Sequence, residues 1–171
     1  LIMDKFARFR YQPCIPLGED GRCVTASAKH TQLSRKAATE GMVLLKNEGS
    51  ILPLKKDASV AVIGEMAKNP RYQGAGSSLV NAIKVDCAYD EIVAKGAKVT
   101  YAPGYSTAKK NKISDDAFIE EAVEAAKGKD AVILFIGLTE EFESEGFDRR
   151  HLGIPPLHIR LVEAVSAVNE N

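Results

Sequence analysis

Short apolar runs alternate along the chain with segments in which apolar residues recur at helical spacing. VAVIG at 60–64 is short, β-branched and apolar on both sides, as is typical of a strand buried on both faces. KVTYAPG at 98–104 and DAVILFIG at 130–137 predict a second and a third strand. Because helical segments separate these runs, the sequence predicts an α/β fold. We expect a mostly parallel sheet flanked by helices on both faces, a three-layer α/β/α sandwich.

The first and the last predicted helix have long apolar faces. The first begins near Thr31 and ends at 47–49, and its face consists of Leu33, Ala37, Gly41, Leu44 and Leu45. Pro155 and Pro156 open the last helix, and His158 is expected on its polar side. The apolar side of that helix consists of Leu157, Leu161, Val165 and Val168.

Two shorter segments predict helices between the strands. One lies around Ile92 and stops at Gly96. The other begins at Ser114, which two aspartates follow, and acid is favoured near the positive end of a helix. It continues to Gly128. Helical connections of this kind are what parallel strands require.

The pattern also predicts how the chain is organised. Residues 1–30 contain prolines, glycines and turn residues without periodicity, which indicates a linker or an extended lead-in. The predicted sandwich occupies residues 31–171. Three strands make a small sheet and no strand follows the last helix, so we expect a truncated domain. An exposed sheet edge can pair with a second copy, and a homo-oligomer is a further expectation.

Charge and composition exclude two classes of partner. The 171 residues include 23 basic and 23 acidic side chains, so the formal net charge is zero. A balanced charge gives no electrostatic reason to expect nucleic acid or an anionic membrane. The sequence also lacks an apolar run of about eighteen residues, the length that spans a bilayer. We therefore expect neither nucleic acid nor a membrane as a partner.

The cysteines leave two interpretations open. Cys14 and Cys23 bracket a loop rich in proline and glycine, and could form a disulfide or half of a metal site. A zinc site would need four closely spaced ligands, and the sequence has no CxxC spacing. The alternative is free thiols in a reducing compartment, and with it we expect a cytoplasmic location. We expect neither a metal ion nor a cofactor.

Two loops that follow predicted strands carry candidate chemistry, since open parallel sheets bind ligands at the carboxyl ends of their strands. The first, EMAKNPRYQGAGSSLV at 65–80, contains Gly74, Gly76 and Ser77. Glycines allow close approach of the backbone, and serines offer hydroxyl and amide groups. The spacing does not match GxxxxGK[ST], which disfavours nucleotide binding. A plain turn and a contact with a polar, uncharged ligand are the other interpretations.

The second loop, TEEFESEGFDRR at 139–150, is strongly acidic. Its carboxylates are those of Glu140, Glu141, Glu143, Glu145 and Asp148. Repulsion among crowded carboxylates favours protonation of at least one, and a carboxyl group that holds a proton near neutral pH can act as a general acid. Arg149 and Arg150 are expected to keep other members ionised and to fix the shape of the loop. The alternative is a solvated acidic loop without a chemical role.

Four stretches of the chain resemble glycoside hydrolase family 3. They are RKAATEGMVLLKNEGSILPL at 35–54, VAVIGEMAKNPRYQGAGSSLV at 60–80, VTYAPGY at 99–105 and AVILFIGLTEEFESEGFDRRHLGIP at 131–155. The run of LLKNEG, LPL and a strand ending in VIG is distinctive, as is EGFDR after a strand ending in GL. The resemblance covers about residues 31–171 and is to the second domain of the family, an α/β sandwich, in particular that of the β-glucosidases.

The resemblance implies a chemistry and the residues that perform it. Family members are retaining, exo-acting glycosidases whose active site lies between a (β/α)8 barrel and this sandwich. The barrel supplies an Asp nucleophile, and the sandwich supplies a general acid/base Glu. The Glu of the family's EG[FY]DR motif falls on Glu145. Loop alignments slip easily by two residues, so Glu143 is a rival for this role and Glu141 a third candidate.

Three further residues match motifs of the family. The serine that can touch the sugar falls on Ser77, and Asp148 and Arg149 match the rest of EGFDR as supports for the loop. No stretch of this chain resembles the barrel or its nucleophile motif. Residues 1–30 look like the segment that links barrel to sandwich.

The function that the resemblance implies is therefore that of one part of a longer enzyme. It would be a retaining, exo-acting β-glucosidase that hydrolyses terminal β-D-glucosyl residues of β-glucosides or oligosaccharides. Its partner would be the N-terminal barrel of the same enzyme. This chain alone is expected to be inactive, because the nucleophile lies in the barrel. The alternative is a non-catalytic carbohydrate-binding or interaction module with the same fold.

Overall fold

The structure, a computed structural model, describes these parts of the chain: Arg22 and residues 27–108, 110–146 and 148–171. The chain divides into two compact units, residues 1–47 and 48–171, which are described separately. The two cysteines of the proposed disulfide or metal site, Cys14 and Cys23, lie outside the described residues. Cys87 is a half-buried free thiol. The predicted boundary between lead-in and sandwich stays a prediction.

The described part of the first unit contains helix α2, Ala28–Gly41. Ser27 caps its start, because its hydroxyl accepts a hydrogen bond from the backbone N–H three residues further on. The prediction that this helix continues to residue 47 is wrong, since Met42 is already extended. Helices gain most of their stability from buried faces, and α2 has no buried residue. Gly41, which disfavours helix, therefore ends it.

The second unit is built on a three-stranded parallel sheet, as predicted. β1, Ser59–Ile63, lies between β2, Lys98–Ala102, and β3, Ala131–Leu134. β3 is shorter than the predicted run, although the Phe135 N–H still donates a 2.7 Å hydrogen bond to the Ile63 carbonyl. Beyond that point the two strands diverge, and the loops that follow them begin.

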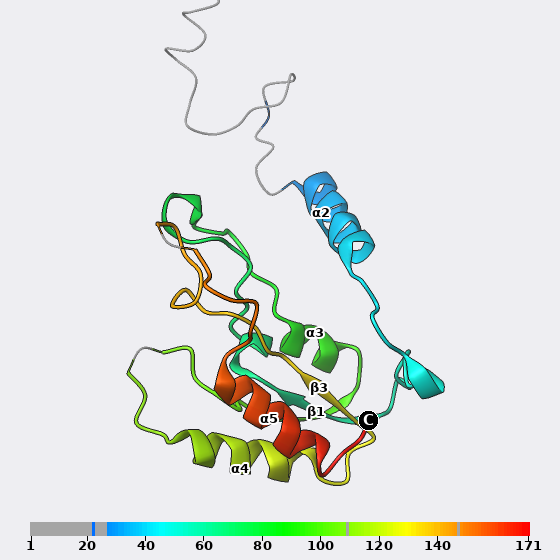
Figure 1. Ribbon diagram of the computed structural model, residues 1–171. Helices are drawn as coiled ribbons and strands as arrows, with labels where there is room; N and C mark the ends of the chain where they lie inside the picture. Colours follow the sequence, from blue (N-terminus) through cyan, green and yellow to red (C-terminus); the bar gives the residue numbers. More distant parts are fainter. Residues whose placement is uncertain (1–21, 23–26, 109, 147) are drawn as a thin grey trace, which may run out of the picture. The chain divides into compact units, whose positions relative to one another are not determined.

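Helices cover both faces of this sheet (Figure 1). α3, Ala88–Ala94, packs on one face, and α4, Asp115–Ala126, and α5, Pro156–Ser166, lie on the other. The hydroxyl of Ser114 caps α4 by accepting a 3.3 Å hydrogen bond from a backbone N–H in its first turn. Proline at the first position of α5 supplies a helical φ where no N–H is needed. The three-layer α/β/α sandwich is confirmed.

The core consists of two clusters, one on each face of the sheet. On the face of α4 and α5 the buried residues are Ala61, Ile63, Ala102, Tyr105, Ala122, Ala126, Leu161 and Val165. On the face of α3 they are Ala58, Val60, Val62, Ala67 and Ala131. Successive residues of β1 point to opposite faces, which explains why this strand had to be apolar on both sides. Each fully buried Val, Leu or Ile contributes roughly 1.5–3 kcal/mol of transfer free energy.

His158 corrects the prediction that it lies on the polar side of the last helix. It is buried, with only 3% of its surface exposed, and its ring lies 4.2 Å from that of Tyr105 between centroids. The backbone N–H of Gly137 donates a 3.4 Å hydrogen bond to its Nδ1 atom. Burial lowers the pKa of His158, so the neutral imidazole is available as an acceptor. The helical pattern of α5 could not show this, since Tyr105 and Gly137 come from other segments.

A polar contact ties β1 and β3 together at the opposite end of the strands. The Asp130 carboxylate accepts hydrogen bonds of 2.7 and 2.8 Å from the backbone N–H and the hydroxyl of Ser59. These two bonds, the backbone one first, lower the pKa of Asp130. The sheet is therefore fixed at its amino end by an ionised side chain and in its middle by burial.

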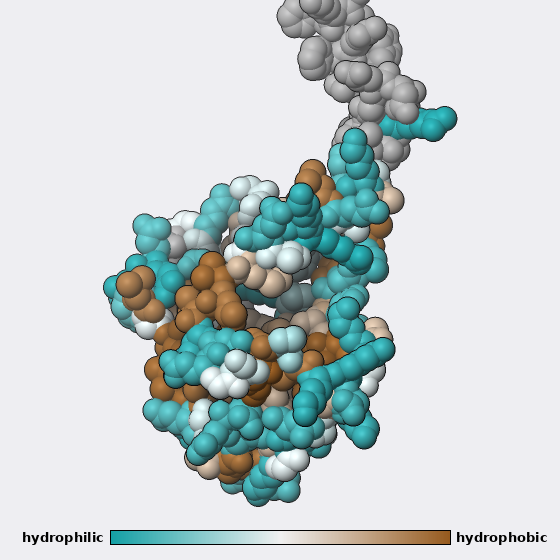
Figure 2. Space-filling view, turned by 90° about the vertical axis from the view of Figure 1, so that its right-hand side faces the viewer, coloured by the Kyte–Doolittle hydropathy of each residue, from teal (hydrophilic) through white to brown (hydrophobic). Residues whose placement is uncertain are grey.

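The surface of the described residues carries both hydrophilic and hydrophobic side chains, as Figure 2 shows for one face. The loops after β1 and β3 expose large apolar residues: Tyr72, Leu79, Val80, Ile83 and Leu152. None of the helices in the described ranges has the length and hydropathy of a membrane span.

Candidate active site

The two loops predicted to carry chemistry leave the carboxyl ends of neighbouring strands. One follows β1 and the other follows β3, and they project side by side from the same edge of the sheet (Figure 1). The first loop leads to α3 and the second to α5, which lie on opposite faces of the sheet. The loops therefore diverge at a switch point of the sheet, which is where open α/β sheets bind ligands.

The structure brings together two of the predicted site residues, Ser77 and Glu145. The Oε2 atom of Glu145 accepts a 2.6 Å hydrogen bond from the backbone N–H of Ser77, and Oε1 accepts a 3.1 Å bond from its hydroxyl. The two residues are 68 positions apart in the sequence. These two hydrogen bonds hold the carboxyl group in place. Because both residues are exposed, the group is still open to a ligand.

Gly76 makes this contact sterically feasible. Its φ is +66°, a conformation that residues with a Cβ rarely adopt. A Cβ at this position would also lie 1.6 Å from Oε2 and 2.7 Å from Cδ of Glu145. The carboxyl group can reach the backbone of Ser77 only because residue 76 has no side chain.

Gln73 closes the loop after β1 on itself. Its Nε2 donates a 3.0 Å hydrogen bond to the carbonyl of Val80, and its Oε1 accepts a 2.6 Å bond from the backbone N–H of the same residue. The side-chain amide thus pairs with Val80 as a backbone peptide group in a strand would. Ser77 therefore lies within a closed segment of eight residues, 73–80.

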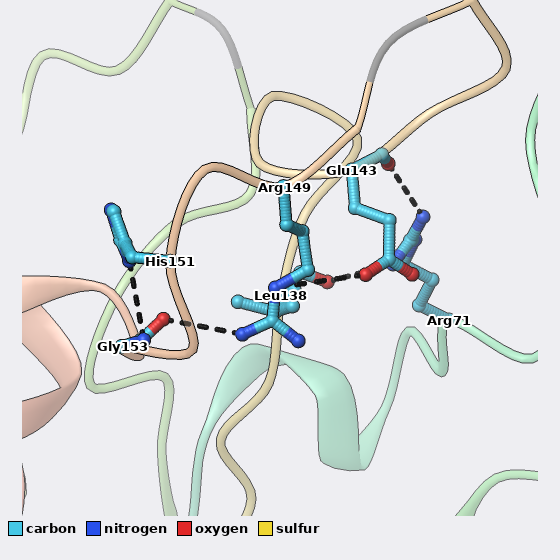
Figure 3. A network of polar contacts seen from close by, with 6 residues as sticks. All are labelled: Arg71, Leu138, Glu143, Arg149, His151 and Gly153. Atoms are coloured by element: carbon cyan, nitrogen blue, oxygen red, sulfur yellow. Dashed lines mark hydrogen bonds and ion pairs between the residues drawn. The ribbon is translucent and has the colours of Figure 1, made fainter.

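Glu143, the predicted rival of Glu145, has different partners (Figure 3). Its Oε2 lies 3.8 Å from Nε of Arg149, and its backbone carbonyl accepts a 3.1 Å hydrogen bond from Arg71. Arg149 also donates a 3.5 Å bond to the Gly153 carbonyl. Arg149 thus links Glu143 of the acidic loop to Gly153 beyond it, and its role as a support of the loop stays a prediction.

Sequence reasoning missed Arg71. Its guanidinium donates hydrogen bonds to the carbonyls of Leu138 at 3.3 Å and Glu143 at 3.1 Å, both on the neighbouring loop (Figure 3). Its partners are backbone groups, so no side-chain pattern could indicate the pairing. The available signal was an arginine within a loop at a strand's carboxyl end, beside a strongly acidic loop.

The remaining acidic residues line two hollows. Glu140 and Glu141 border a cavity of about 330 Å³, which Arg71 and Tyr72 also line. Asp148 borders a second hollow of about 340 Å³, in company with Arg149, Arg150 and His151. No hydrogen bond or ion pair joins the Asp148 carboxylate to another described residue, and its supporting role stays a prediction.

Tyr105 fixes the roots of both loops. It is 1% exposed, and its hydroxyl donates a 2.8 Å hydrogen bond to the Phe135 carbonyl while accepting a 3.4 Å bond from the backbone N–H of Met66. Burial raises the pKa of Tyr105 to about 12, so the hydroxyl keeps its proton at neutral pH. Because Met66 opens the first loop and Phe135 opens the second, one side chain connects their starting points.

Comparison with known families decides what kind of domain this is. The model of the glycosyl hydrolase family 3 C-terminal domain matches residues 42–171. The chain belongs to this family. The resemblance predicted from the EGFDR and GAGSS loops is thereby confirmed.

Several curated glycosidases match most of the chain. The thermostable β-glucosidase B of Acetivibrio thermocellus is 46% identical over 145 residues, which cover 83% of this chain and 19% of the relative. An exo-α-(1→6)-L-arabinopyranosidase of Bifidobacterium longum is 42% identical over 151 residues, which cover 83% of this chain and 20% of the relative. The chain thus spans about a fifth of the length of these relatives.

Solved structures share the fold. A β-glucosidase of Bifidobacterium adolescentis superposes with a TM-score of 0.80 at 42% identity, over 90% of this chain and 22% of that chain. A β-glucosidase of Kluyveromyces marxianus in complex with glucose has a TM-score of 0.76 at 20% identity, over 86% of this chain and 36% of that chain. The second likeness supports the fold alone.

The described residues of this family 3 domain show no metal centre. Among them, no group of three or more His, Cys, Asp or Glu side chains could hold a metal ion.

Proposed function

We propose that this chain is the C-terminal domain of a retaining, exo-acting β-glucosidase and that Glu145 is its general acid/base. The observation that carries the proposal is the contact between Glu145 and Ser77 at the carboxyl ends of β1 and β3. Glu145 would protonate the departing glycosidic oxygen and later deprotonate the attacking water. Ser77 would lie close to the sugar.

The hydroxyl of Ser77 suits a carboxyl group that changes its charge during the reaction. A hydroxyl both donates and accepts hydrogen bonds. It can donate to Glu145 when the carboxyl group is ionised and accept from it after protonation. The backbone N–H of Ser77 can only donate, and holds the other oxygen, Oε2. One residue can thus orient Glu145 in both halves of the reaction.

Glu143 fits a supporting role better than the acid/base role. Its carboxylate is paired with Arg149, and its backbone carbonyl is held by Arg71. The Glu143 carboxylate thus faces Arg149, whereas the Glu145 carboxyl group contacts Ser77, the residue proposed to lie close to the sugar. We therefore assign loop support to Glu143 and Arg149, and expect the same of Asp148.

A second domain must complete the site. Retaining hydrolysis needs a nucleophilic carboxylate roughly 5–5.5 Å from the acid/base. We propose that an N-terminal (β/α)8 barrel of the same enzyme supplies it. The exposed apolar residues on the two loops, Tyr72, Leu79, Val80, Ile83 and Leu152, offer a surface on which that barrel could pack. By itself, this chain is expected to hydrolyse no β-glucoside.

The sugar is the least constrained part of the proposal. Among the relatives is an arabinopyranosidase, and a probable exo-1,4-β-xylosidase of Aspergillus terreus is 40% identical over 135 residues. We propose a terminal β-D-glucosyl residue because the β-glucosidase of Acetivibrio thermocellus has the higher identity, 46%. Turnover of aryl glucosides, arabinopyranosides and xylosides by the full-length protein tests this choice directly.

Replacement of the acid tests the assignment of Glu145. In the full-length protein, Glu145→Gln should lower kcat/KM for cellobiose by roughly 100- to 10,000-fold. The loss should be smaller for 2,4-dinitrophenyl glucoside, whose leaving group needs no proton, and azide should partly restore turnover of that substrate. Cellobiose hydrolysis at the parental rate would show that the assignment is wrong.

Two variants serve as controls. Glu163→Gln removes an exposed carboxylate from α5 and should leave both substrates unaffected. Glu143→Gln removes the pair with Arg149 but not the acid, so its loss should be smaller and azide should not restore it. If Glu143→Gln instead showed the leaving-group dependence and the azide rescue, the two glutamates would have to exchange roles.

A further inference from the structure

We propose that Arg71 is a positioning residue for Glu145. The inference rests on the proposed acid/base role of Glu145. Arg71 belongs to the loop after β1, and its guanidinium donates to two carbonyls of the loop after β3, those of Leu138 and Glu143. Among the described residues, no hydrogen bond or ion pair joins its side chain to Glu145, so it acts through the backbone of the acidic loop, whose carbonyls it binds (Figure 3).

Arg71 provides the second of two cross-links between the loops. The first is the contact of Ser77 with Glu145, and the second is the contact of Arg71 with Glu143. Ser77 follows Arg71 by six residues, and Glu145 follows Glu143 by two. A single cross-link would let one loop pivot about the other. Two cross-links at separated points fix both the distance and the orientation of the acidic loop.

Arg71 also defines the turn that carries Glu143. Its NH1 and NH2 atoms bind carbonyls at the two ends of the segment 138–143. On the other side, Arg149 pairs with the Glu143 carboxylate and binds the Gly153 carbonyl. Glu143 thus lies between two arginines, one on its backbone and one on its side chain (Figure 3). These contacts fix the backbone at Glu143 and therefore the position of Glu145, two residues further on.

The geometry calls for arginine rather than any cation. Guanidinium is planar and presents its N–H groups in a fixed fork, so it can bind two carbonyls at once. A lysine ammonium is a point charge on a flexible stem and would satisfy one carbonyl at a time. Arg71→Lys therefore keeps the charge of the site and loses the cross-link geometry.

The effect should be seen in catalysis more than in folding. Arg71 and Glu143 are exposed, Leu138 is half-buried, and none of the three belongs to either core cluster. A net hydrogen bond on the surface contributes little to the free energy of unfolding. A catalytic group displaced by about 1 Å can nevertheless lose 100-fold in rate. The loss should depend on the leaving group, because Arg71 is inferred to hold the acid that protonates it.

The test compares Arg71→Gln and Arg71→Lys with the parent full-length protein on two substrates. Both variants should lower kcat for cellobiose, Arg71→Gln by roughly 10- to 100-fold and Arg71→Lys by less. Turnover of 2,4-dinitrophenyl glucoside should fall much less, since that leaving group needs no acid. Hydrogen–deuterium exchange of residues 138–146 should be faster in Arg71→Gln than in the parent. This readout holds even where activity is low.

The matched control is Arg160→Gln. Arg160 is also an exposed arginine of this domain, but it pairs with Asp116 between α5 and α4, away from the strand exits. It should change neither kcat nor the exchange of residues 138–146. Equal losses on both substrates in Arg71→Gln, or a parental kcat on cellobiose, would overturn the inference.

Glu145→Gln, measured in parallel, separates the two proposals. If Glu145→Gln shows the leaving-group dependence and Arg71→Gln does not, only the role of Arg71 is wrong. If Glu145→Gln matches the parent on cellobiose, the acid/base assignment is wrong and the positioning role falls with it. If both show the dependence, with the larger effect in Glu145→Gln, the inference is supported.

Discussion

The sheet and the pair of loops that leave it are held together by different forces. In the sheet, Val62 and Ile63 are 0% exposed, and two apolar clusters cover its faces. In the loops, Ser77 and Glu145 are exposed and are joined by hydrogen bonds alone. Burial is non-directional and supplies most of the stability. Hydrogen bonds supply little net stability, but they impose a strict geometry. Stability and chemistry can therefore be altered separately in this domain.

The largest expected effect lies in the buried core that covers the sheet. Leu161→Ala should lower the free energy of unfolding by roughly 2–5 kcal/mol, because Leu161 is fully buried and packs close to Ile63 and Gly104. Denaturant titration followed by circular dichroism measures the loss. Ile159→Ala, at a position of α5 that is 43% exposed, is the control and should change stability by about 0.5 kcal/mol or less. Equal losses in both variants would show that burial of Leu161 is not the cause.

The next effect lies in the loops. Gly76→Ala should displace the Glu145 carboxyl group and reduce kcat of the full-length protein by roughly 100-fold, equivalent to about 2.7 kcal/mol of barrier. Gly128→Ala is a matched control, since Gly128 has a φ of +65° and no atom within 4 Å of its Cβ position. It carries a similar backbone strain without the clash, so it should lose stability but keep kcat. A similar fall in kcat for both would mean that strain, and not the lost contact, is responsible.

A smaller effect is expected where the two loops leave the sheet. Tyr105→Phe removes the hydroxyl that links Met66 to Phe135 and should cost about 1 kcal/mol of stability. Tyr89→Phe, whose hydroxyl has no hydrogen-bond partner among the described residues, should cost less than half of this. Thermal unfolding of the three proteins measures the difference. A larger loss for Tyr89→Phe would contradict the linking role of Tyr105.

The smallest effect is a change of stability with pH. Burial holds the pKa of His158 below its usual value, so the unfolded chain takes up a proton at a higher pH than the folded one. The stability that the neutral ring contributes is present above about pH 6.5 and is lost as the pH falls towards the folded pKa. Unfolding measured between about pH 7.5 and pH 5.5 should show this slope, and His158→Gln should flatten it. An unchanged slope in the variant would exclude His158 as the cause.

The fold was predictable wherever the residues of one segment alone determine its secondary structure. VAVIG could only be a strand buried on both faces, and Ser114 with two aspartates marked the start of α4. Where the outcome depended on a neighbour, prediction failed. Leu44 and Leu45 continued the helical spacing of α2, but nothing in α2 is buried, and the helix ends at Gly41. His158 was assigned to a polar face that Tyr105 in fact covers.

The sequence indicated candidate site residues, whose roles stay predictions, but it did not indicate the contacts between the loops. The rule on strand ends and the family motifs indicated Ser77 and Glu145, and the structure places them in contact. The choice between Glu145 and Glu143 could not be made from spacing, because both lie on the same acidic loop. Arg71 decides how that loop is held, yet its partners are carbonyls 67 and 72 positions away. Because every residue has a backbone carbonyl, the sequence does not indicate which carbonyls accept these hydrogen bonds.

The closed segment formed by Gln73 and Val80 has a practical consequence. Its ends are joined to each other by two hydrogen bonds, so the eight residues 73–80 form a self-contained segment. We expect such a segment to keep its conformation when it is exchanged as a unit between related enzymes. Exchange of residues 73–80 among family 3 enzymes that act on different sugars is therefore a direct way to engineer what this edge of the sheet accepts.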